Sequence, residues 1–337
     1  MSEYKFYSIH NIVKIKTNTE IPIPNYFRIG RKIDNPDIEI IQENFSVNVP
    51  REKKKQRKDY FVWVDETALY IDYEVLNMKL FISDIQGRTR IKFTETYRNH
   101  GKKHISNLID IVLAIKLIQK GYAPIHAGCV SCGDKAILIS GMGSTGKTST
   151  VLSLLDAEHY KFMADDMTIV SGDGKAYSYP EKVGVSFQTL TGNMFSPSIK
   201  TKIFGKLTEF HLISLFFGKF FNLWRMEQKE IPDEMIKDKA FIDKVFLITC
   251  GEKDEIKQIE INKAVRMLMM SMMDEHSLFG NYALNFYSYL FGLDLLEFAC
   301  KAKEIIKNAL NKAKCFELKS NKTWKYPEMV KKVIEVN

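Results

Sequence analysis

The residues of this chain with the clearest chemical capability form a phosphate-binding loop. Residues 141–148 match the pattern G-x-x-x-x-G-K-[ST] at every defined position. In such a loop the glycines let backbone N–H groups face the phosphates, Lys147 reaches the β and γ phosphates, and Thr148 can bind magnesium. The pattern therefore predicts that the chain binds a nucleotide. The residues that we predict to bind the nucleotide phosphates are Gly141, Gly143, Ser144, Thr145, Gly146, Lys147, Thr148 and Ser149.

Two adjacent carboxylates follow the loop along the chain. Asp165 and Asp166 interrupt the otherwise apolar run 160–170. A magnesium nucleotide needs a carboxylate from a neighbouring strand to position the metal or a water molecule. We therefore favour a functional role for this pair over a structural pair in a surface bulge. Adjacent side chains on a strand point to opposite faces, so the two acids are expected to play different parts.

The elements that must position these residues are predicted in the required order. Residues 136–139 predict a buried strand before the loop, and residues 148–155 predict the opening of a helix after it. The run 124–130 and the turn signal at Gly133 and Asp134 predict a hairpin, whose second arm is the strand of the loop. An antiparallel strand is thus expected beside the nucleotide strand.

The chain as a whole is predicted to belong to the α/β class. Alternating apolar and polar residues, as in 60–64, predict strands within residues 1–100. Over residues 104–120 the apolar positions recur at helical spacing, and Gly121 follows as a stop. We therefore expect a β-rich N-terminal region over residues 1–100, and a P-loop core with a C-terminal α/β extension over residues 101–337.

The composition is typical of a globular protein with an anionic partner. The chain has 337 residues, of which 45% are hydrophobic and 27% are charged, so it can bury a large core. The net charge of +8 suits a nucleotide, an acidic peptide, a nucleic acid or a membrane surface, and does not choose among them. The first five residues carry no apolar signal core, and no window reaches the roughly 20 apolar residues of a spanning helix. We expect no transmembrane segment and a cytoplasmic location, and a homo-oligomer is left open.

Three further features are interpreted as structural. The basic run 51–58 lies between two predicted strands, where a solvated loop is favoured and nucleic-acid binding is not supported. Cys129 and Cys132 form C-x-x-C, but no second pair at zinc spacing accompanies them. The aromatic segment 210–224 is too short and interrupted to span a bilayer, and core packing is favoured for it.

Three short motifs in this order resemble the HPr kinase/phosphorylase family and its relatives. They are the His-Ala-Gly triplet 126–128, the P-loop 141–148 and the Ala-Asp-Asp triplet 164–166. The resemblance covers residues 104–190. It implies a P-loop core related to phosphoenolpyruvate carboxykinase, with ATP and Mg²⁺ as cofactors. Members of that family phosphorylate a serine hydroxyl on a protein, a peptide or, in some relatives, a small molecule.

The resemblance also implies roles for individual residues. Asp165 or Asp166 would take the proton of the acceptor hydroxyl. We assign Asp165 to the metal, with Thr148, and Asp166 to the hydroxyl. His126 would lie near the transferred phosphoryl group, and a core histidine bonded to backbone is the alternative.

One family signature is absent. The Ile-Arg-Gly-Leu-Gly type signature that follows the acids in bacterial HPr kinases has no counterpart here, and Glu181 and Lys182 would stand in for its acid and its cation. HPr itself is therefore not the expected substrate.

Other nucleotide-binding classes fit the sequence less well. A GTPase should carry Asn-Lys-x-Asp, but the pairs 262–263 and 321–322 both lack the final acid, and the Ser-Gly-Gly signature of ABC-type ATPases is absent. The resulting hypothesis is an ATP-dependent kinase that transfers the γ-phosphoryl group to a hydroxyl, on serine or threonine of a peptide or protein. The alternatives are a small hydroxylated metabolite as acceptor, or an ATP-regulated switch without an acceptor.

Overall fold

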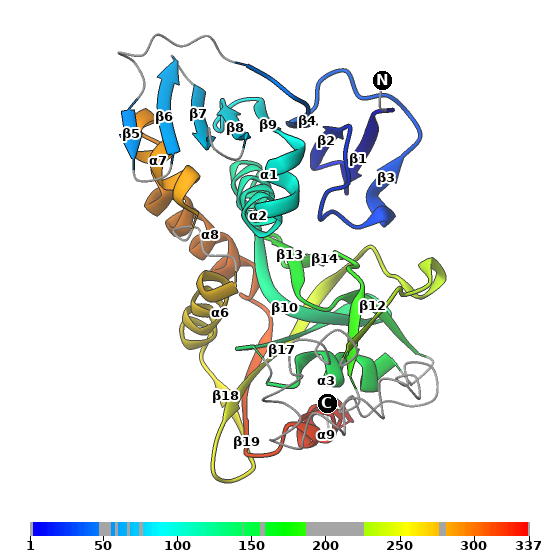
Figure 1. Cartoon of the computed structure of the whole chain (residues 1–337). Coiled ribbons are helices and arrows are strands. Elements are labelled where there is room, and N and C mark those ends of the chain that lie inside the picture. Colours follow the sequence, from blue (N-terminus) through cyan, green and yellow to red (C-terminus); the bar gives the residue numbers. More distant parts are fainter. Residues whose placement is uncertain are drawn as a thin grey trace, which may run out of the picture. The chain divides into compact units, whose positions relative to one another are not determined.

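The computed structural model shows a mixed α/β protein that divides into two compact units (Figure 1). One unit comprises Met1–Ala123 and His276–Ala302, and the other comprises Pro124–Glu275 and Lys303–Asn337. The structure describes residues 3–46, 55–57, 60–65, 68–73, 77–143, 145–155, 159–186, 226–275 and 281–335. None of the helices in these ranges combines the length and the apolar character needed to cross a bilayer.

The first unit is built on a sheet whose order, within the described residues, is β3-β1-β2-β4-β9-β8-β7-β6-β5. Its strands are β1 (Lys5–Ile9), β2 (Val13–Thr17), β3 (Arg28–Ile29), β4 (Ile38–Gln42), β5 (Lys55–Arg57), β6 (Tyr60–Asp65), β7 (Ala68–Tyr73), β8 (Met78–Ser83) and β9 (Thr89–Phe93). Its helical elements are η1 (Asn25–Phe27), α1 (Glu95–His100), α2 (Lys102–Gln119) and α7 (Tyr282–Phe291). Burial alternates along β8 and β9, as the polar and apolar alternation predicts.

Helix α2 confirms the helix predicted over residues 104–120. It ends before Gly121, which has a positive φ of 84°. Lys116 lies among its buried residues, and its ammonium donates hydrogen bonds to the carbonyls of Ile85 and Gly87. These contacts belong to the first compact unit, which therefore extends past the boundary predicted at residue 100.

The interpretation of the basic run 51–58 as a loop is wrong for residues 55–57. Lys55–Arg57 forms β5, which pairs antiparallel with β6 at one end of the sheet order. Lysine and arginine are common on edge strands because their charge discourages pairing with another chain. The remaining residues of the run lie outside the described residues, as does the aromatic segment 210–224.

The second unit holds the P-loop. Its main sheet has the order β11-β10-β13-β14-β17-β19-β18, with β12 beside β10 and a further pairing of β11 with β17. The strands are β10 (Tyr122–Cys132), β11 (Lys135–Gly141), β12 (Tyr160–Ala164), β13 (Met167–Ser171), β14 (Lys175–Tyr177), β17 (Lys239–Cys250), β18 (Glu255–Ile259) and β19 (Lys314–Ser320). A small separate sheet pairs β15 (Val183–Ser186) with β16 (Met226–Lys229). The helical elements are α3 (Lys147–Leu155), η6 (Asp233–Met235), α6 (Ile261–Glu275), η7 (Thr323–Lys325) and α9 (Tyr326–Glu335). Helix α8 (Leu295–Ala309) is shared, since it belongs to the first unit up to Ala302 and to the second from Lys303.

The predicted hairpin before the P-loop is confirmed. β10 and β11 pair antiparallel from Cys132 and Lys135 back to Ala127 and Ser140. The strand predicted over 160–170 is instead divided into β12 and β13, with the two acids at the bend between them. Both acids therefore lie at a break between two strands, and Asp165 contacts the loop residue Thr148.

Parallel pairing brings three strand ends to the same edge of this sheet. β17 lies between β11 and β19 and runs parallel to both. Since the carboxyl ends of parallel strands meet at one edge, the P-loop after β11 and the turn η7 after β19 emerge together there. Open α/β sheets bind their ligands at this edge.

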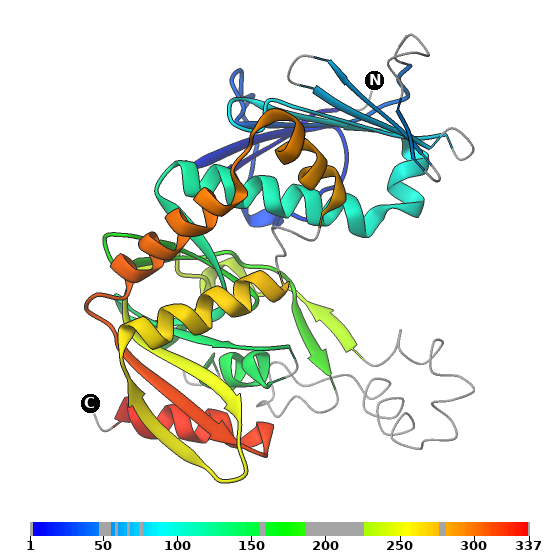
Figure 2. The ribbon, with the colours of Figure 1, turned by 90° about the vertical axis from the view of Figure 1, so that its left-hand side faces the viewer.

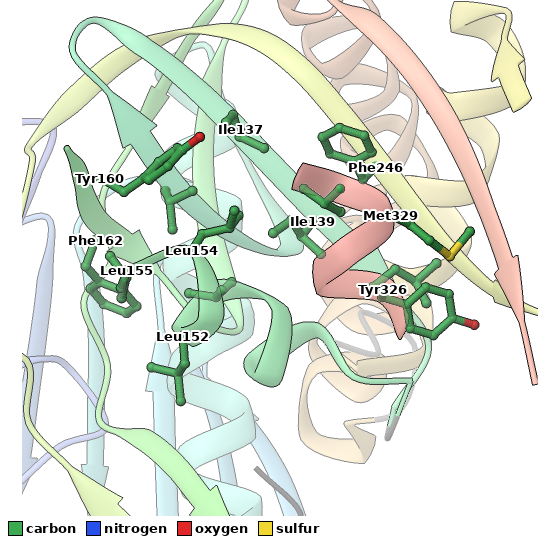
Figure 3. Packing of buried hydrophobic residues seen from close by; sticks show 14 of the residues in the cluster. Ile137, Ile139, Leu152, Leu154, Leu155, Tyr160, Phe162, Phe246, Tyr326 and Met329 are labelled. Atoms are coloured by element: carbon green, nitrogen blue, oxygen red, sulfur yellow. The ribbon is translucent and has the colours of Figure 1, made fainter. Parts of the chain in front are cut away.

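Helices α3 and α9 cover one face of these strands, and α6 lies on the other (Figure 2). Alternate residues of the strands, such as Ile139, Phe246 and Leu318, enter one buried cluster with residues of α3 and α9. Figure 3 shows Leu152 and Leu155 of α3, together with Tyr326 of α9, in that cluster. The C-terminal helix thus packs directly against the helix that follows the P-loop.

Candidate functional site

The P-loop lies between a strand and a helix, in the order that the sequence predicts. Gly141 ends β11 and Lys147 begins α3. Gly146 has a φ of +98°, a left-handed conformation that favours glycine. The hydroxyl of Thr145 donates a hydrogen bond of 2.7 Å to the carbonyl of Met142 and curls the loop on itself. Gly143 is exposed, and Ser144 lies outside the described residues.

Lys147 is buried at the base of the loop and meets His126. Its Nζ donates a hydrogen bond of 2.8 Å to the carbonyl of Gly141 and contacts Nε2 of His126. An ammonium group has only donors, so Nε2 must accept, which corresponds to a neutral ring with its proton on Nδ1. The structure therefore brings His126, 3% exposed on β10, to the lysine of the P-loop.

The two acids have different surroundings, as expected. Asp165 is 4% exposed, and its Oδ2 accepts a hydrogen bond of 3.1 Å from the hydroxyl of Thr148. Asp166 is exposed to solvent. Burial and the negative charge of Asp166 raise the pKa of Asp165 to about 7, against the opposing effects of Thr148 and Lys147. One acid thus belongs to the loop and the other faces solvent.

Asp165 and Thr148 fit a magnesium ion that is shared with a nucleotide. Oδ1 of Asp165 is buried and has no hydrogen-bond partner in the described part of the chain. A buried acceptor without a partner costs about 1–3 kcal/mol, which a bound cation would offset. Within those residues no group of three or more His, Cys, Asp or Glu side chains gathers for a metal. Magnesium typically takes one or two carboxylates, with water and substrate phosphates as further ligands.

Gly128 allows β10 to lie close to α3 and to the backbone of Asp165. A Cβ atom built on this glycine would lie 2.6 Å from Cγ2 of Val151 in α3 and 3.0 Å from the carbonyl of Asp165. The distance to Val151 is shorter than real Cβ contacts and the distance to the Asp165 carbonyl is tight, so a side chain at this position would force its neighbours to shift. The glycine two residues after His126 is therefore required by packing.

Glu181 and Lys182 lie on the segment between β14 and β15, after the two acids in the chain. Lys182 forms an ion pair of 2.8 Å with Glu230, and both side chains are more than half exposed. The backbone N–H of Glu181 donates to the carbonyl of Tyr179. Within the described residues, the ion-pair partner of the Lys182 side chain is therefore Glu230 and neither of the two acids. An exposed ion pair of this kind contributes little to stability.

Two contacts to the loop could not be recognised from motifs. The hydroxyl of Ser271, buried on α6, lies 3.4 Å from the carbonyl of Gly141. A Cβ atom on Gly146 would lie 3.2 Å from the carbonyl of Thr323 and 3.6 Å from the ring of Tyr326. The one feature of the sequence that could have indicated the contact of Ser271 with the loop is a hydroxyl on the buried face of a helix. The segment around Thr323 has no sequence feature that indicates its contact with Gly146.

The cysteines of the C-x-x-C sequence are free thiols on β10. Cys129 is buried and Cys132 is partly exposed. Burial raises the pKa of the Cys129 thiol far above its usual range, so it carries no nucleophilic thiolate at neutral pH.

Fold and site together define a mixed α/β protein with a P-loop sequence at the edge of parallel strands. A comparison with models of protein families gives no match. A comparison with curated proteins gives no match either.

Proposed function

We propose that this chain is an ATP-dependent kinase that transfers the γ-phosphoryl group to the hydroxyl of serine or threonine in a peptide or protein. The observation that carries the proposal is the hydrogen bond between Thr148 and the buried Asp165, next to Lys147. A P-loop hydroxyl, a carboxylate and a lysine at one strand edge are the groups that phosphoryl transfer requires. The resemblance to the HPr kinase/phosphorylase family supports the same assignment.

Each residue has a distinct part in the proposed reaction. Lys147 and the loop N–H groups hold the β and γ phosphates, and Thr148 and Asp165 hold Mg²⁺. The metal, when bound, neutralises charge on the phosphate oxygens. The acceptor oxygen forms a bond to the γ phosphorus, the bond from that phosphorus to the bridging oxygen breaks, and the hydroxyl proton passes to Asp166. Positioning and charge neutralisation provide most of the rate in such a transfer.

His126 has a positioning part in this proposal. Its neutral ring accepts a hydrogen bond from Lys147 and so holds the ammonium at the base of the loop.

Two alternatives to a serine or threonine acceptor are proposed. The acceptor is a small hydroxylated metabolite, or the protein is an ATP-regulated switch and has no acceptor. The proposed location is the cytoplasm, and self-association stays open.

The test is a transfer assay with γ-labelled ATP and Mg²⁺. Serine and threonine peptide libraries, protein extracts and small alcohols serve as acceptors. Wild-type protein is expected to label a peptide or protein. Lys147→Ala should abolish labelling while it stays folded, because this side chain serves the phosphates. Lys301→Ala removes a lysine from an exposed ion pair with Glu297 and serves as the control. If labelled inorganic phosphate were the sole product, the kinase proposal would be rejected and the ATP-regulated switch would be favoured.

A further inference from the structure

We propose that Trp324, on the turn η7 beside the P-loop, is the stacking platform for the purine base of the bound nucleotide. This inference rests on the proposed function, since it takes the phosphates of that nucleotide to lie in the loop. The P-loop pattern accounts for the phosphates and leaves the base without a partner. The structure offers one at the same strand edge.

The position of η7 follows from the sheet. The P-loop leaves the carboxyl end of β11, and η7 (Thr323–Lys325) follows β19 at the same edge. The two segments touch, because a Cβ atom on Gly146 would lie 3.2 Å from the carbonyl of Thr323. Trp324 is the next residue. A nucleotide that is held by its phosphates in the loop can therefore reach this ring with its base.

The ring of Trp324 is available for stacking. It is 55% exposed, which is a large apolar surface for a tryptophan to leave in water. Nζ of Lys322 lies 5.6 Å from its centroid, a cation–π contact that orients the indole. In the described part of the chain no other aromatic ring packs on it. Aromatic side chains that bind bases present this kind of open ring.

The segment that carries the ring is held in place before any ligand binds. The hydroxyl of Ser320 donates to Asp254 at 2.7 Å and accepts from the backbone N–H of Lys322 at 3.0 Å. The buried Tyr326 donates to the carbonyls of Thr249 and Ser320. Lys325 forms an ion pair with Asp254. A braced aromatic loses little conformational entropy when a base stacks on it.

Lys322 adds charge to this site. It belongs to the same turn as Trp324, and no carboxylate pairs with it in an ion pair among the described residues. A cation next to the stacking ring suits a ligand whose base is followed by phosphates. The combination of an open indole and an ammonium therefore fits a nucleotide better than a purely apolar ligand.

The test separates the base from the phosphates. Binding of ATP and of tripolyphosphate, each with Mg²⁺, is measured by calorimetry for wild type, Trp324→Ala and Trp324→Phe. We expect Trp324→Ala to weaken ATP about tenfold, in the range reported for base stacking, and to leave tripolyphosphate unchanged. Trp324→Phe should recover most of the ATP affinity. Tyr289→Ala, which removes another exposed aromatic ring, is the matched control.

Each contrary result has a distinct meaning. Unchanged ATP affinity in Trp324→Ala would overturn the base site and leave the kinase proposal standing. Equal weakening of ATP and tripolyphosphate would also overturn it, since the residue would then only support the loop. A higher KM for a peptide acceptor with unchanged ATP affinity would assign the ring to the acceptor. A wild-type protein that binds neither ligand would reject the P-loop function itself, and the base site with it.

Discussion

Asp165 and Asp166 are adjacent in the chain and differ in what surrounds them. The hydroxyl of Thr148 binds one, and solvent reaches the other. This difference agrees with the sequence argument that neighbouring side chains diverge, although the reason is a bend between β12 and β13 and not a continuous strand. The type of residue was predictable here, whereas the burial of Asp165 depends on α3, which the sequence pattern does not position.

Substitution of the two acids should separate metal binding from chemistry. Asp166→Asn is expected to lower kcat by about two to four orders of magnitude, as loss of a general base does, with ATP affinity retained. Asp165→Asn should raise the Mg²⁺ concentration needed for ATP binding, because it removes a charged ligand. The measurement is ATP binding and turnover across a magnesium titration. Near wild-type turnover in both variants would remove the pair from the reaction.

At the scale of elements, local order was predictable and distant packing was not. The hairpin of β10 and β11, the P-loop and the start of α3 follow from neighbouring residues, so turn signals and periodicity suffice for them. The contact of η7 and α9 with Gly146 joins segments that are far apart in the chain. No periodic pattern encodes such a contact. The strand β5 was missed for another reason, since a run of charge predicts solvent exposure and edge strands are exposed too.

A side chain on Gly146 should disturb this packing. Alanine there would need a φ of +98° and would meet the carbonyl of Thr323 at 3.2 Å. We expect Gly146→Ala to lower the free energy of unfolding by about 1–3 kcal/mol and to abolish ATP binding. Gly172→Ala is the matched control, because its Cβ would meet only Cβ of Asn308, at 3.6 Å. Denaturant unfolding and ATP binding are measured together. A stable Gly146→Ala that binds ATP normally would contradict the described loop conformation.

For the whole molecule, the sequence indicated the α/β class and a β-rich beginning, but not how the chain divides. The first unit takes in α2 and then gains residues 276–302 from the last part of the chain. Asn281 links this late segment to α2 within the first unit, since its side-chain amide donates a hydrogen bond of 3.0 Å to the side-chain oxygen of Asn107. A boundary drawn from composition assumes that each unit is continuous in sequence. This unit is discontinuous, so a truncation at residue 100 would remove part of its core.

The stability of that unit should depend on pH through Asp110 on α2. Burial raises the pKa of this carboxyl to about 7, from 3.8 in an unfolded chain. The folded state therefore retains a proton that the unfolded chain releases between about pH 4 and 7. Between about pH 4 and 7 the Asp110 carboxyl therefore lowers the free energy of unfolding as pH rises. Above about pH 7 this decrease in stability is complete, because the carboxyl is ionised in both the folded and the unfolded chain.

Replacement of Asp110 by asparagine should remove this dependence. The Tm of Asp110→Asn is expected to match wild type near pH 4, where both side chains are neutral in the folded state, and to exceed it at pH 8. Asp34→Asn, which changes a carboxylate in an exposed ion pair with Lys32, is the control for the loss of one charge. Thermal unfolding of the three proteins at both pH values measures the effect. A Tm difference that is the same at pH 4 and pH 8 would show that the Asp110 carboxyl ionises in the folded chain as readily as in water.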